Sequence, residues 1–178
     1  MMTLHFAFYL FVGVFAFIGL MRGWRKEMIV AFSIVLGLTL IILLRKYVPQ
    51  IQAFKIEGIE YFWIRVSIIA VLVFFGYQTV HMAKLHPKVM NETFSDSLGG
   101  LIVGAFNGYL LIGSLWLFLS DAQYPFPDFI MAPIAGTPLG DAALKIVSVL
   151  PPTIWPFQEP VIYFIEIICF IFLLAVFI

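Results

Sequence analysis

The stretch from residue 95 to 120, SDSLGGLIVGAFNGYLLIGSLWLFLS, constrains the fold of this chain more than any other. It is longer than the roughly 20 apolar residues that a helix needs to cross a bilayer. Its Gly100, Gly104 and Gly108 recur every four residues, which aligns them on one helix face. Such a glycine zipper lets a second backbone approach closely in lipid. We therefore expect the buried central helix of a membrane bundle, with Asn107 beside the glycine face and in need of a polar partner.

Composition supports lipid as the surrounding medium. Hydrophobic residues make up 63% of the 178 residues and charged residues 11%, against roughly 45–50% and about 25% in soluble proteins. A soluble fold could not bury so much apolar surface. The formal net charge is zero, which argues against nucleic-acid binding. The chain has one cysteine, Cys169, so it can form no intramolecular disulfide.

Apolar runs divide the chain into spans. They predict an all-α, polytopic membrane helix bundle of four to five transmembrane helices. We expect a four-span bundle over residues 1–120, a proline-rich extramembrane or interfacial segment over 121–160, and a fifth transmembrane or docking helix over 161–178. The apolar runs are residues 4–21, 28–44, 61–83, 95–120 and 161–178.

The proline-rich segment contains the signature of one short helix. Thr137 and Pro138 are typical of an N-cap and a first helical position. Over residues 139–150, Leu144 and Val147 share an apolar side with Leu150. We therefore expect a short amphipathic helix at the membrane surface or docked on the bundle.

A charged turn, RGWRKE at residues 22–27, separates the first two runs. So short a connector predicts an antiparallel hairpin. We expect Arg22 and Arg25 to meet the headgroups and Glu27 to occupy the first turn of the next helix, where the helix dipole favours an anion. Asp96 begins the fourth span on the same membrane side. It is expected to cap its own helix or to pair with Arg22, Arg25 or Lys26.

Two further charges lie within apolar runs. Arg65 falls in the first turn of the third span, and we expect its long side chain to reach back to the headgroups. Glu166 interrupts the last run. It is expected to lie near the interface or to contact a partner subunit.

The distribution of basic residues predicts the orientation. Arg22, Arg25 and Lys26 contrast with residues 1–21, which carry no lysine or arginine. By the positive-inside rule, this first connector is expected in the cytoplasm. The proline-rich segment would then lie on the opposite side.

Two segments together resemble a known family. Residues 22–27 are similar to the R-G-[FW]-x-x-E signature of the colicin V production protein family, with Arg22, Gly23 and Glu27 at the matching positions. Residues 96–108 are similar to its D-R-x-x-G-x-x-x-G-x-x-R-G pattern, although Ser97 and Asn107 replace the arginines. The resemblance implies a protein of the bacterial inner membrane linked with toxin production or export and with envelope homeostasis. The residues that match the second pattern are Asp96, Gly100, Gly104 and Gly108.

The sequence favours a non-enzymatic scaffold or accessory subunit that assembles with other membrane proteins or with itself. Serine–histidine and paired-aspartate arrangements are missing from the spans, so we expect no catalytic residues and no cofactor. His81 and His86 are five residues apart, a spacing that does not suit a metal site on one helix face. The alternative is a channel or transporter component, in which a homo-oligomer forms a polar path. The candidate path residues are Thr39, Ser67, Asn107 and Ser114.

Overall fold

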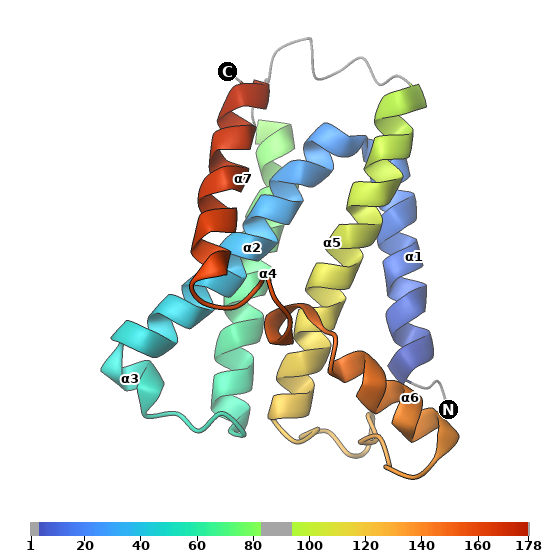
Figure 1. The fold of residues 1–178 in the computed structure, drawn as a ribbon, viewed down its shortest axis with the longest axis vertical. Coiled ribbons are helices and arrows are strands. Elements are labelled where there is room, and N and C mark those ends of the chain that lie inside the picture. The colour runs from blue at the N-terminus through green and yellow to red at the C-terminus, as the bar shows by residue number, and fades with distance from the viewer. Residues whose placement is uncertain (1–3, 83–93, 178) are drawn as a thin grey trace.

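The structure, a computed structural model, describes residues 4–82 and 94–177, and all the regular secondary structure in this part of the chain is helical (Figure 1). Four of its helices are long and apolar enough to cross a membrane. They confirm the predicted all-α fold class and make the chain a multi-pass membrane protein whose apolar helices contact lipid. These helices are α1 (Leu4–Arg22), α2 (Trp24–Tyr47), α4 (Ile59–Met82) and α5 (Phe94–Asp121).

The centre of the bundle is shared between two helices. In the spanning windows, 56% of α2 is buried, against 44% of α5 and 11% of α1. α2 packs against α4, α5 and α7, whereas α5 packs against α1, α2 and α4. The expectation that residues 95–120 alone form the central helix was therefore incomplete, because α2 is buried more deeply than α5.

α1 and α2 run in opposite directions from the predicted tight turn, but they pack against each other over little of their length (Figure 1). α1 lies along α5, and its contacts with α2 are confined to a few residues near the turn (Figure 1). The reversal is made by Gly23 alone, whose φ of 81° suits a residue without a side chain. After the turn, α2 crosses the bundle away from α1. The main partner of α1 is therefore α5, whose glycine face lets the two helices pack closely.

The shorter elements cover one end and one side of the bundle. α3 (Pro49–Gln52), α6 (Pro138–Val147) and the 3-10 helix η2 (Pro151–Thr153) lie toward the end opposite the Gly23 turn (Figure 1). α7 (Val161–Phe177) packs on α2. Its 17 residues correspond to a length of about 25 Å, somewhat less than the roughly 30 Å of a hydrocarbon core.

The predicted amphipathic helix is present as α6. Thr137 caps α6, and its Oγ1 accepts a hydrogen bond of 3.0 Å from the Gly140 backbone amide. α6 turns Gly140 and Ala143 toward the bundle, while Leu144 is exposed. Of the residues expected on its apolar side, Leu150 is fully buried, whereas Leu144 is 41% exposed.

Candidate functional site

A buried polar cluster lies just below the Gly23 turn and joins α1, α2 and α5. Glu27 and Asn107 are both completely buried. Arg22 Nη1 donates a hydrogen bond of 2.9 Å to Glu27 Oε1. Asn107 Nδ2 lies 2.9 Å from both Glu27 Oε2 and the Glu27 backbone oxygen. The two carboxylate oxygens of Glu27 are thus bound by different helices, and the predicted need of Asn107 for a partner is met by Glu27.

The local sequence explains how these charges come together. Arg22 is the last residue of α1, and α2 begins at Trp24, so Glu27 falls in the first turn of α2 as expected. The single-residue turn at Gly23 points Arg22 back toward Glu27 instead of toward the headgroups, which corrects the expectation for Arg22. The Arg22 guanidinium also lies 4.2 Å from the ring centre of Tyr77. No pattern in the sequence identified Tyr77, because its contact with Arg22 depends on the packing of α4 alongside α2.

The glycine face of α5 brings α1 into backbone contact. A Cβ atom added at Gly104 would lie 2.9 Å from Gly19 Cα, and one added at Gly100 would lie 2.9 Å from Gly23 Cα. Real side chains do not pack so closely. At Gly108 the nearest atom would be Phe15 Cβ, at 2.8 Å. All three glycines therefore lie where α1 and the turn approach α5 most closely, beside the Glu27–Asn107 contact.

Asp96 binds the turn from the start of α5. Its Oδ1 accepts a hydrogen bond of 2.8 Å from Trp24 Nε1. Arg22, one of the three basic residues considered as a partner for Asp96, pairs instead with Glu27. The contact with Trp24 was not predicted, because the two residues lie 72 positions apart and meet only when α5 packs beside the turn.

The arrangement serves to hold helices together. A carboxylate and a guanidinium are costly at hydrocarbon depth unless they are paired and hydrogen-bonded. Here the ion pair, the carboxamide and the glycine contacts fix α1, α2 and α5 in one register. Within the described residues, Asn107 Oδ1 and the Tyr77 hydroxyl are buried without a hydrogen-bond partner.

A second ion pair lies at the opposite end of the bundle. Arg65 is 5% exposed, and its Nη1 lies 2.6 Å from Asp121 Oδ2. Its guanidinium also lies 4.7 Å from the Tyr61 ring centre and 4.4 Å from that of Phe118. The expectation that Arg65 extends to the headgroups was wrong. The pairing could have been found from topology, since the start of the third span and the end of the fourth lie on the same membrane side.

The residues proposed for a polar path do not share one surface. Thr39, Asn107 and Ser114 are buried inside the chain, whereas Ser67 is exposed on α4. Ser114 Oγ donates to the backbone oxygen of its own helix at Leu110, 2.6 Å away. Of the three buried residues, Asn107 bonds another helix of the chain, so these positions belong to the interior of the bundle and do not line one path.

Glu166 lies on α7, apart from the buried cluster. Both of its carboxylate oxygens are shielded, and neither has a hydrogen-bond partner within the described residues. Its predicted role as a partner contact stays a prediction. No group of three or more potential metal ligands occurs among the described residues, whereas His86 and the side chain of His81 lie outside them.

Comparison with known proteins adds no further constraint. No family model, curated protein or solved structure matches the chain.

Proposed function

We propose that the chain is a non-enzymatic integral-membrane scaffold or accessory protein, related in role to the colicin V production family that its motifs resemble. In this role it acts in toxin production or export and in envelope homeostasis by assembling with other membrane subunits. The observation that supports this most directly is the Glu27–Asn107 contact. It joins the two separate segments that resemble the family, residues 22–27 and 96–108, in one structural unit.

The burial of this unit favours an architectural role. Glu27 and Asn107 are both inaccessible, so their polar groups act between helices of the chain and do not face a solute. The outward side of α1 offers the surface for assembly. It carries several large exposed side chains on a helix that is mostly unburied, namely Phe6, Tyr9, Leu10, Phe17 and Met21.

Affinity purification from native membranes in mild detergent tests the proposal. We expect a tagged chain to retain a different membrane protein in fixed stoichiometry. A matched variant sharpens the experiment: Gly13 lies on α1 with open space where a side chain would project. Gly13→Leu should therefore leave the fold intact while weakening a partner that packs on this face.

Two results would count against the scaffold. One is a chain that purifies without any other protein, and the other is a homo-oligomer that conducts ions or solutes in liposomes. The second result would support the channel or transporter alternative.

The proposal includes a location in the bacterial inner membrane with Arg22, Arg25 and Lys26 in the cytoplasm. Single cysteines introduced at Lys26 and at Gln123, in a Cys169→Ser background, test this orientation in intact cells. A membrane-impermeant maleimide should label position 123 but not position 26. The reverse labelling would invert the topology.

A further inference from the structure

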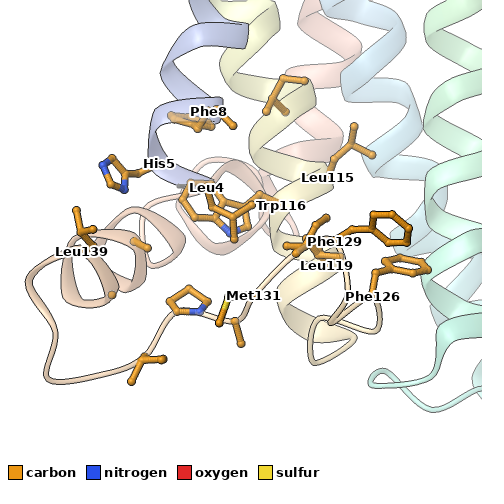
Figure 2. Close-up of a pocket in the computed structure, with 18 of the residues that line it drawn as sticks. Leu4, His5, Phe8, Leu115, Trp116, Leu119, Phe126, Phe129, Met131 and Leu139 are labelled. Carbon is orange, nitrogen blue, oxygen red and sulfur yellow. The ribbon is translucent and has the colours of Figure 1, made fainter. Parts of the chain in front are cut away.

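A cavity of about 900 Å³ lies at the end of the bundle opposite the Gly23 turn (Figure 2). It lies between the first turns of α1, the last part of α5, segment 126–134 and α6. Its volume falls within the roughly 300–1,000 Å³ typical of small-molecule sites. The side chains that line it are mainly aliphatic and aromatic, with Leu4, Phe8, Leu115, Trp116, Phe129 and Met131 among them.

The depth of the cavity places it among lipid tails. The lining residues of α5, from Ile112 to Leu119, lie roughly 3 to 14 Å along the helix axis before Asp121. Asp121 is the last residue of α5 and pairs with Arg65, so it marks the polar edge of the span. The cavity therefore lies at acyl-chain depth in one leaflet.

The rim of the cavity is continuous with the lipid-facing surface. Phe11 on α1, Leu139 on α6 and Ile134 in segment 126–134 line the cavity and are each exposed by 44% or more. Because these apolar side chains face both the cavity and the lipid, a hydrocarbon chain can enter the cavity sideways from the bilayer. An aqueous solute would find no comparable polar route through these three residues.

The polar groups of the lining favour one kind of headgroup. Asp128 and Thr137 line the cavity together with His5, and all three belong to the part of the chain that lies at this end. None of the described lining residues is a lysine or an arginine. The exposed Asp128 carboxylate is the only carboxylate among the described lining residues, and it attracts an ammonium group and repels anionic heads.

We propose that this cavity binds an acyl chain of a zwitterionic, amine-headed phospholipid from the bilayer. The acyl chain of the lipid lies between α1 and α5 against Trp116, and the ammonium group of its head lies beside Asp128 and Thr137. This site is independent of the scaffold role proposed above. It requires only that α6 and segment 126–134 cover the end of the bundle as described.

Native mass spectrometry of the full chain in detergent, with phosphatidylethanolamine, phosphatidylglycerol or palmitate added separately, tests the proposal. We expect one phosphatidylethanolamine per chain, with about fivefold weaker retention of phosphatidylglycerol, as an exposed charge contact would give. Asp128→Asn should abolish this preference. Equal retention of all three ligands by the wild type, or an unchanged preference in Asp128→Asn, would overturn the headgroup assignment.

A pair of tryptophan variants tests where the acyl chain of the lipid binds. Ala7 lines the cavity, whereas Val14, two turns further along α1 and close to the same face, does not. Ala7→Trp should fill the cavity and remove the bound lipid, while Val14→Trp should retain it. Lipid bound equally by both variants would contradict the site.

A measurement on the unmodified chain covers the case in which Ala7→Trp fails to fold. Phosphatidylethanolamine with a photoreactive diazirine in its acyl chain should crosslink mainly to peptides from residues 4–11, 112–119 and 126–143. Crosslinks spread evenly over the outward faces of α1 and α7 would show ordinary boundary lipid and overturn the proposal.

Discussion

The two ends of this bundle are stabilised in different ways. At the Gly23 turn, backbone meets backbone across the glycine face of α5, and both oxygens of buried Glu27 are bound. At the other end, Arg65 pairs with Asp121, whose side chain is 31% exposed. Here a proline-rich segment lies over an apolar cavity of about 900 Å³. One end is closely packed, whereas the other retains space.

The difference follows from the residues that each end has available. Glycines at four-residue spacing remove side chains from one helix face, so helices can approach until their backbones touch. Prolines lack the backbone N–H that a continuous helix needs, so residues 121–160 cross the end of the bundle in short pieces. The closely packed end thus sets the geometry of α1, α2 and α5, and the covered end leaves room for a ligand. Four predictions test this contrast, from the largest expected effect to the smallest.

Removing Glu27 should have the largest effect. Glu27→Leu leaves the Arg22 guanidinium without its carboxylate and removes one acceptor from Asn107. We expect a loss of about 3 kcal/mol in the free energy of unfolding, at the lower end of the range for breaking a buried pair, because Arg22 is partly exposed. Unfolding in detergent, followed by circular dichroism against an increasing mole fraction of denaturing detergent, measures this change.

The double variant Arg22→Met/Glu27→Leu is the matched control. It replaces both charges by apolar groups, which is often neutral for a buried pair. We expect it to recover most of the stability that Glu27→Leu loses. A double variant as unstable as the sum of its single changes would show that the two residues act separately.

The glycine face provides the second prediction. At Gly104 an added methyl group would lie 2.9 Å from Gly19 Cα, so Gly104→Ala must push α1 away from α5. The expected cost is about 1–3 kcal/mol, as for other overpacked sites. Gly13→Ala is the control because nothing lies near its added Cβ. Equal unfolding midpoints for the two variants would mean that the close approach adds no stability.

The spans and the start of α6 could be predicted because they depend on local sequence. The length of an apolar run determines whether a helix can cross a bilayer, and the Thr137 side chain caps α6 by accepting from a backbone amide only three residues away. Gly100, Gly104, Gly108 and Asn107 could likewise be selected from spacing and depth. These features need no knowledge of which helices become neighbours.

The way in which residues from different helices meet in the buried polar cluster could not be predicted in the same way. Arg22 can satisfy its charge either at the headgroups or with Glu27, and the sequence does not distinguish the two. The choice is made by the Gly23 turn and by the packing of Asn107, which lies 80 residues from Glu27 along the chain. Tyr77 gives no signal at all, since its contact with Arg22 exists only once α4 is packed on α2.

Weakening the ion pair at the covered end should have a smaller effect. Asp121→Asn removes the charge opposite Arg65, but the Arg65 guanidinium keeps its contact with the Phe118 backbone oxygen and with two aromatic rings. Because the Asp121 side chain is partly exposed, we expect a loss of about 1 kcal/mol, near the upper end for exposed pairs. The same detergent unfolding assay measures it. A loss as large as that of Glu27→Leu would remove the contrast between the two ends.

The smallest expected effect on stability comes from the exposed contact between the end of α2 and the start of α7. Glu159 accepts hydrogen bonds from the Tyr163 hydroxyl and from Lys46 Nζ, the latter at 3.1 Å. Both favour the carboxylate, the Tyr163 bond more strongly, and so they lower the pKa of Glu159. Because the folded pKa is lower than the unfolded one, the stabilisation is complete above the ordinary glutamate pKa of about 4.3 and is lost as the pH falls through the folded value.

An NMR titration of the Glu159 side-chain carboxyl carbon checks both the sign and the order of these contributions. The midpoint should lie below about 4.3 in the wild type. Tyr163→Phe should raise it more than Lys46→Ala does, since the tyrosine bond has the larger influence on the pKa of Glu159. Lys145→Ala, on α6, should leave it unchanged. If instead Lys46→Ala raised the pKa of Glu159 more, the exposed Lys46 ammonium would be its principal partner. An exposed ion pair would then matter more at this end of the bundle than the contrast with the buried pair at the Gly23 turn predicts.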